Sequence, residues 1–217
     1  PVMGHCRGSN SVRDAAISGF DLILHGTLME PDALEAVVKR KIPIAPTFTF
    51  QANLIDYGHF VGASDYIKDL FRREIIDSAV MLRKAYDHGV PILCGTESGF
   101  SVTPYGQWHY REMEILMKEM GFTALEAIRS STSVNAYAMR LEGQIGQIKE
   151  GSIADIILVS VNPIKDITSL GNLENIKLVM KSGEIQKFEE EIDRLPIPGW
   201  RVVDYGQILT KNLVKKK

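Results

Sequence analysis

The feature that most constrains the fold is a regular alternation of short apolar runs and amphipathic segments over residues 1–141. The apolar runs are PVMGH, DLILH, IPIAPTF and PILCGTES, and each is continuous rather than alternating in polarity. Short continuous apolar runs are typical of buried parallel strands, and strand–helix–strand crossovers build a parallel sheet. The sequence therefore predicts an α/β fold with four strand–helix units in this region.

Three of these runs lead to a side chain that can bind a metal. PVMGH ends at His5, DLILH ends at His25, and PILCGTE ends at Glu97. Active sites of α/β sheets and barrels lie at the carboxyl ends of the strands. Two imidazoles and a carboxylate suit Zn²⁺, with Fe²⁺ or Mn²⁺ as alternatives, and they leave positions open for water. We expect a divalent metal centre, with one or two ions, formed by His5, His25 and Glu97.

Each of these residues also has a structural interpretation. A single histidine at a strand end is more often a satisfied structural side chain than a ligand. Three such residues at equivalent positions of one sheet favour a catalytic metal site. A metal lowers the pKa of bound water to about 7, and a nearby carboxylate can take the proton. We therefore expect Glu97 to be catalytic as well as ligating, and the substrate to be a small molecule.

The loops after the third and fourth strands are candidates for substrate contact, because such loops carry binding residues in barrels. His109, beside Trp108, lies where a lid could cover the site, and simple packing is an equally good interpretation. The residues predicted to contact substrate are Thr47, Phe50, Tyr105, Trp108 and His109.

The pattern changes after residue 141. The segments GQIGQIKEGS, ADIILVS and IKLVMKSGEIQKF are separated by turns that contain glycine, which predicts short strands of a small β module. We expect three regions: an α/β part over 1–141, β strands over 142–190, and a carboxyl-terminal extension over 191–217.

Charge and composition exclude several classes of protein. The formal net charge is −2, so no general attraction to nucleic acid or membrane is expected. The sequence has no run of 18 apolar residues and only two cysteines, which do not form a disulfide framework. We expect a cytoplasmic protein that acts on a small molecule.

Six motifs follow one another along the chain: GHCRG, ILHGT, GTESG, TALEAIRSSTSVNAYAMRL, GQIGQIKEGSIADIILVSVNP and KLVMKSGEI. Together they resemble the later half of a metal-dependent amidohydrolase, of the prolidase-like and imidazolonepropionase-like subgroup. The resemblance covers about residues 1–188. It implies the second half of a (β/α)₈ TIM-type barrel plus part of a small β-sandwich. It also implies that His5 and His25 are the ligands of strands five and six, and that Glu97 takes the strand-eight position.

Two departures from the family pattern affect these expectations. The paired H-x-H of strand one and the lysine of strand four have no counterpart, so we expect a fragment of a longer enzyme, or else a homo-oligomer. Glu97 replaces the usual aspartate of strand eight. The expected reaction is hydrolysis of an amide, peptide or urea-like C–N bond by metal-activated water. The alternatives are a non-catalytic half-barrel that binds a ligand, and a lactone or phosphotriester hydrolase on the same scaffold.

Overall fold

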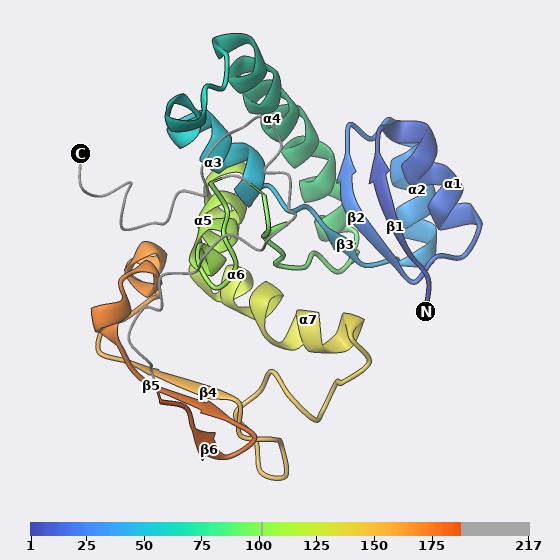
Figure 1. Cartoon of the computed structure of the whole chain (residues 1–217). Helices are drawn as coiled ribbons and strands as arrows, with labels where there is room; N and C mark the ends of the chain where they lie inside the picture. Colours follow the sequence, from blue (N-terminus) through green and yellow to red (C-terminus); the bar gives the residue numbers. More distant parts are fainter. Residues whose placement is uncertain (101, 188–217) are drawn as a thin grey trace, which may run out of the picture.

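The computed structural model describes residues 1–100 and 102–187. It contains a parallel sheet of three strands in the order β1-β2-β3 (Figure 1). The strands are β1 (Met3–Arg7), β2 (Leu22–Thr27) and β3 (Ile44–Ala45), joined by the crossover helices α1 (Ser9–Ile17) and α2 (Pro31–Arg40). Both strand pairs are parallel, which confirms the predicted α/β architecture.

The fourth apolar run joins this sheet through one parallel bridge, between Ile44 and Ile92. The Ile44 N–H donates to the carbonyl before Ile92 at 2.9 Å, and the Ile44 carbonyl accepts from the N–H after it at 2.8 Å. The sequence predicts longer strands here. Pro43 and Pro46 flank β3 and have no N–H to donate, so the ladder cannot extend in either direction along β3.

Six further helical elements follow β3 along the chain as far as Ala138. The helix α4 packs against β2, α3 and α5 (Figure 1). The last helical segment of this region is interrupted: Thr132, with φ −124° and ψ −92°, separates α6 from α7. The elements are α3 (Thr49–Tyr57), the 3-10 helix η1 (Gly58–Val61), α4 (Asp65–Asp87), α5 (His109–Met120), α6 (Ala124–Ser131) and α7 (Ser133–Ala138).

The main core lies between the sheet and the helices. Ile23, Ile44 and Ile92 come from three neighbouring strands and are almost fully buried, together with Leu82 of α4 and Leu116 of α5. Burial of each such side chain contributes about 2 kcal/mol relative to exposure. This packing holds the strand ends, and the residues that follow them, in fixed relative positions.

The strand β1 differs from the expectation of a strand buried on both faces. Its residues alternate, with Gly4 and Cys6 buried and Met3, His5 and Arg7 exposed. β1 is an edge strand of the sheet, and α1 packs against it. One face of β1 therefore meets the core while the other presents His5 and Arg7.

A second sheet lies apart from the first, beyond α5, α6 and α7 (Figure 1). It is antiparallel, in the order β4-β5-β6, with β4 (Ile156–Val159), β5 (Ile176–Lys181) and β6 (Glu184–Ile185). The 3-10 helices η2 (Ile167–Gly171) and η3 (Leu173–Asn175) connect β4 to β5. Ile167 is buried against Met113 and Ala127, which joins this region to α5 and α6.

The expected strand GQIGQIKEGS is wrong, because residues 143–152 form turns. Gly143, Gly146 and Gly151 all have positive φ, between 77° and 83°, and so break extended backbone. The predicted extension 191–217 lies outside the described residues. Among the helices of the described part, none combines the length and the apolar character needed to cross a membrane.

Candidate metal centre

His5, His25 and Glu97 converge at one place, and we call them the trio. One ligand atom from each lies within 4.8 Å of the other two. Nε2 of His25 is 3.0 Å from Nδ1 of His5 and 3.8 Å from Oε1 of Glu97. The two imidazole rings meet edge to face, with centroids 4.2 Å apart. The trio thus brings two ring nitrogens and a carboxylate oxygen to a common point.

The strand register explains this convergence. In the β1–β2 pair, Cys6 lies opposite His25, so the two histidines come from adjacent positions at the carboxyl ends of neighbouring parallel strands. Glu97 follows the bridge at Ile92 by five residues, on the segment next to β3. All three side chains therefore belong to the same end of the sheet, where α/β proteins place their active sites.

The backbone at three successive strand ends is left-handed. The φ angles are 72° at His25, 57° at Thr47 and 51° at Glu97. Non-glycine residues adopt this region rarely, and a β-branched residue such as Thr47 does so only under constraint. Conformations of this kind cost about 1–3 kcal/mol each and cluster at functional sites. The strained positions here include two members of the trio and the residue between them along the chain.

Thr47 fixes the tautomer of His25. Its Oγ1 lies 2.7 Å from the carbonyl oxygen of Pro46 and 2.7 Å from Nδ1 of His25. A hydroxyl has one proton, and the Pro46 carbonyl can only accept it. With that proton given to Pro46, the Thr47 oxygen accepts from the N–H of His25 Nδ1, and the lone pair of Nε2 faces His5 Nδ1, 3.0 Å away.

The protonation states also suit a metal. Burial lowers the pKa of His25 to about 4, and repulsion from His5 and Arg7 acts in the same direction. His25 is therefore neutral at pH 7, so its contact with Glu97 is not an ion pair. Burial raises the pKa of the Glu97 carboxyl above its ordinary value, and the charge of Arg7 opposes this. A neutral imidazole with a free lone pair is what metal binding requires.

The spacing of the donors fits a small divalent ion. Two imidazole nitrogens on one tetrahedral Zn²⁺ stand about 3.3 Å apart at ordinary bond lengths. The 3.0 Å between His5 and His25 is close to this value, and the Glu97 oxygen lies slightly farther out. The trio is therefore a chemically suitable set of ligands for Zn²⁺ and for related ions such as Fe²⁺ and Mn²⁺.

A scan of protein-family models matches residues 1–186 to the model described as "Amidohydrolase family". This match covers most of the chain. The chain belongs to the amidohydrolase family.

Individual relatives agree with this assignment. Over 192 residues the chain is 24% identical to ochratoxinase from Aspergillus niger, covering 86% of this chain and 38% of that protein. A crystal structure of a Xaa-Pro dipeptidase with bound methionine has 30% identity and a TM-score of 0.71, over 86% of this chain and 45% of that one. A prolidase complexed with N-methylphosphonate-L-proline has 24% identity and a TM-score of 0.71, over 87% and 45%. The chain spans less than half the length of these relatives.

The neighbours superpose on this amidohydrolase chain over about 45% of their length, so the fold here corresponds to part of a barrel. The residues expected to contact substrate occupy different environments within it. Thr47 is buried beneath His25, Tyr105 is exposed with its hydroxyl against Gly99, and His109 is exposed at the start of α5. Trp108 is buried, with its ring 5.4 Å from that of Tyr57. Contact with substrate stays a prediction for each.

Phe50 belongs to a row of aromatic rings that connects the segments following Glu97 and His5. Its centroid lies 4.8 Å from that of Phe100 and 6.0 Å from that of Phe71. Phe100 follows Glu97 by three residues, and Phe71 lies 5.8 Å from the guanidinium of Arg7, which follows His5 by two residues. The row therefore links the two outer segments that bear the trio.

Asn135 of α7 is a support that the sequence analysis missed in this amidohydrolase. Its amide accepts from the Cys94 N–H at 3.2 Å and donates to the Cys94 carbonyl at 2.9 Å. These bonds replace a neighbouring strand for the segment that leads to Glu97. Asn135 is a polar residue in the middle of the short helix SVNAYA, and this position in the sequence is the signal that could have identified it.

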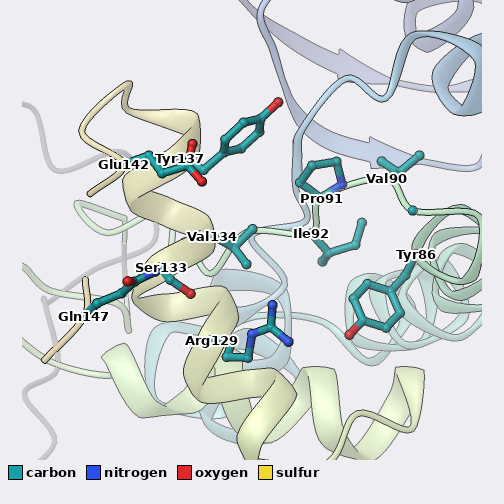
Figure 2. A pocket seen from close by; sticks show the side chains of 11 residues that line it. Tyr86, Val90, Pro91, Ile92, Arg129, Ser133, Val134, Tyr137, Glu142 and Gln147 are labelled. Carbon is teal, nitrogen blue, oxygen red and sulfur yellow. The ribbon is translucent and has the colours of Figure 1, made fainter. Parts of the chain in front are cut away.

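A cavity of about 330 Å³ lies elsewhere, at the amino-terminal side of the Ile92 segment (Figure 2). Tyr86 of α4, Arg129 of α6 and Val134 of α7 contribute to its wall, and none of the trio lines it. The cavity and the candidate metal centre are therefore separate features.

Proposed function

We propose that this chain carries the strand-five, strand-six and strand-eight part of a metal-dependent hydrolase that cleaves a C–N bond in a small amide or dipeptide. The observation that carries this proposal is the convergence of His5, His25 and Glu97 within 4.8 Å at one end of the parallel sheet. Family membership and the resemblance to ochratoxinase and to a Xaa-Pro dipeptidase support the choice of an amide or peptide bond.

The chain's own residues have distinct roles in this proposal. Nε2 of His25 and Nδ1 of His5 hold a divalent metal, with Zn²⁺ as our first choice and Fe²⁺ or Mn²⁺ as alternatives. The metal supplies Lewis-acid chemistry, because it polarises a carbonyl and lowers the pKa of water. Glu97, whose carboxyl pKa is raised by burial, accepts a proton from the attacking water and delivers it to the leaving amine.

The surroundings of the trio are suited to an apolar substrate group. Phe50, Phe71 and Phe100 form an aromatic row between the segments that follow Glu97 and His5, and Phe100 is half exposed. Such rings bury apolar surface and exclude water near the reacting bond. We propose that they contact a side chain of the substrate next to the cleaved bond.

The test uses the full product of the gene that encodes these 217 residues, loaded with Zn²⁺. Its activity is measured on Xaa-Pro dipeptides, N-acyl amino acids, a lactone and a phosphotriester. We expect hydrolysis of at least one amide, reduced by about 10² or more in Glu97→Gln and unchanged in Glu35→Gln, which alters an exposed carboxylate of α2. Turnover of only the lactone or phosphotriester would show that the bond class is wrong. If the protein retains no metal and hydrolyses none of these compounds, the alternative of a non-catalytic ligand-binding protein is correct.

A further inference from the structure

Glu112 is a fully buried carboxylate whose hydrogen bonds all go to one turn. It lies on α5, and its side chain is 0% exposed. Oε1 accepts from the N–H of Phe48 at 3.0 Å, and Oε2 accepts from the N–H of Thr49 at 2.8 Å and from its hydroxyl at 2.7 Å. Thr47 precedes these donors directly, and we call residues 47–49 the ligand turn.

These donors are the first groups of α3. The first N–H groups of a helix have no partner within it, and the residue before α3, Phe48, supplies no side-chain cap. Glu112 therefore caps α3 from a different helix, more than sixty residues along the chain. The positive end of the α3 dipole also favours the carboxylate at this place.

The ligand turn is also strained and touches a trio residue. Thr47 has a left-handed φ of 57° and is buried, and its hydroxyl lies 2.7 Å from Nδ1 of His25. A β-branched residue keeps such a conformation only where its surroundings hold it. The two peptides that follow Thr47 are held by Glu112. A continuous chain of contacts thus runs from Glu112, through the ligand turn, to His25.

We propose that Glu112 is a positioning residue that sets the orientation and the tautomer of His25 through the ligand turn. The inference rests on the proposed role of His25 as a metal ligand, although the tautomer itself can be measured without metal. Groups that orient a ligating histidine change metal affinity by about 10- to 100-fold when they are removed. Thr47 contacts His25 directly, whereas Glu112 contacts the peptides that follow Thr47.

The test compares three variants of the full product of the gene that encodes these 217 residues. Glu112→Gln replaces one acceptor oxygen with an amide, so that at least one N–H of the ligand turn loses its partner. Thr49→Val is milder, since it removes one of the three donors and keeps the β-branched shape. Glu126→Gln is the matched control, because Glu126 also caps a helix, accepting from Thr123 at the start of α6, but it is not bonded to the ligand turn.

Two measurements are made on each variant besides the melting temperature. The tautomer of His25 is read from long-range ¹H–¹⁵N spectra of the metal-free protein, with the ring assigned through His25→Gln. Zn²⁺ affinity is measured by competition with a chelator. We expect the wild-type ring to carry its proton on Nδ1. We expect Glu112→Gln to give a mixture of tautomers and about tenfold or more weaker Zn²⁺ binding, Thr49→Val a smaller change in the same direction, and Glu126→Gln no change in either.

The outcomes separate positioning from simple capping. A lower melting temperature in Glu112→Gln with unchanged tautomer and affinity would overturn the proposal and leave Glu112 as a helix cap. If Glu112→Gln does not fold, an unchanged His25 tautomer in Thr49→Val overturns it equally. If the wild-type protein, tested as the full product of the gene, binds no Zn²⁺, the proposed function fails, while the tautomer comparison still decides the role of Glu112.

Discussion

Nη2 of Arg7 lies 2.6 Å from both carboxylate oxygens of Glu74. The two residues come from the end of β1 and from the middle of α4, and the side chain of Glu74 is almost buried. Arg7 follows His5 by two residues along the exposed face of β1. The pair therefore ties the longest helix to the strand end that bears one member of the trio.

Breaking this pair from one side is expected to destabilise the chain. Arg7→Met leaves the Glu74 carboxylate buried without its partner, and we expect a loss of about 2 kcal/mol in the free energy of unfolding. The double variant Arg7→Met with Glu74→Leu removes both charges and should recover at least half of that loss. Urea unfolding of the four proteins measures the cycle. Additive effects of the two substitutions would contradict the coupling inferred from the contact.

Gly26, the residue after His25, is expected to tolerate no side chain. Its φ is +61°, and a Cβ there would lie 2.7 Å from Cγ2 of Ile44, a stiff β-branched neighbour in the core. Left-handed strain and overpacking together predict a loss of about 2–4 kcal/mol for Gly26→Ala. Gly62→Ala is the control, since its φ is also positive and no atom lies within 4 Å of the added Cβ. Equal melting temperatures for the two variants would show that the contact with Ile44 is unimportant.

Zn²⁺ is expected to stabilise the chain through the trio. A ligand that binds only the folded state, at a free concentration 100 times its Kd, adds about 2.7 kcal/mol to the free energy of unfolding. The melting temperature should therefore rise with added Zn²⁺, and His25→Ala should abolish the rise. His59→Ala removes a histidine that stacks on Phe60 in η1 and should leave the rise intact. A rise that survives in His25→Ala would assign the metal to some other site.

The stability of the fold is expected to fall with rising pH because of Glu112. Burial raises the pKa of Glu112 from its ordinary 4.5 to about 7, although hydrogen bonds from the ligand turn oppose this. Between these values the unfolded chain has lost its proton while the folded chain retains it, so stability present below pH 4.5 is lost as the pH rises through 7. The full difference corresponds to roughly 3 kcal/mol.

The measurement is the free energy of unfolding of the wild-type chain minus that of Glu112→Gln, followed from pH 4.5 to pH 8. Taking the difference cancels the other titrating groups. We expect this difference to become smaller as the pH rises, because the wild type loses stability and the variant does not. A flat profile would mean that Glu112 is ionised throughout this range in both states.

Removing the Asn135 side chain is expected to loosen the segment that leads to Glu97. Asn135→Ala deletes two hydrogen bonds to the backbone of Cys94, and we expect a loss of about 2–3 kcal/mol. Amide hydrogen exchange at Cys94 should accelerate more than exchange in β2. Asn135→Asp keeps the acceptor and loses the donor, so it should give an intermediate loss. Unchanged exchange at Cys94 would count against this support.

The parallel sheet could be predicted because its signals are local. His5 and His25 stand one strand–helix unit apart in a chain of continuous apolar runs, so their side chains had to reach the same end of adjacent strands. Glu97 follows the same logic on the fourth run.

Other features depend on contacts that the sequence does not specify. Glu112 lies on the apolar face of α5, in phase with Leu116 and Met120, which marks it as unusual but does not say which donors it meets. The exposure of β1 on one face depends on its place at the sheet edge. The turns at 143–152 replaced an expected strand because three glycines adopt positive φ, and the pattern of apolar residues alone did not reveal that choice.

The left-handed strand ends also have an evolutionary meaning. At His25, Thr47 and Glu97 the backbone angles would be met at lower cost by glycine or asparagine. Substitution by those residues would raise the stability of the fold, and natural proteins keep less stable residues mainly where activity needs them. A histidine, a threonine and a glutamate at these three positions therefore cost the fold stability that glycine or asparagine would spare, which is expected where a side chain serves more than packing.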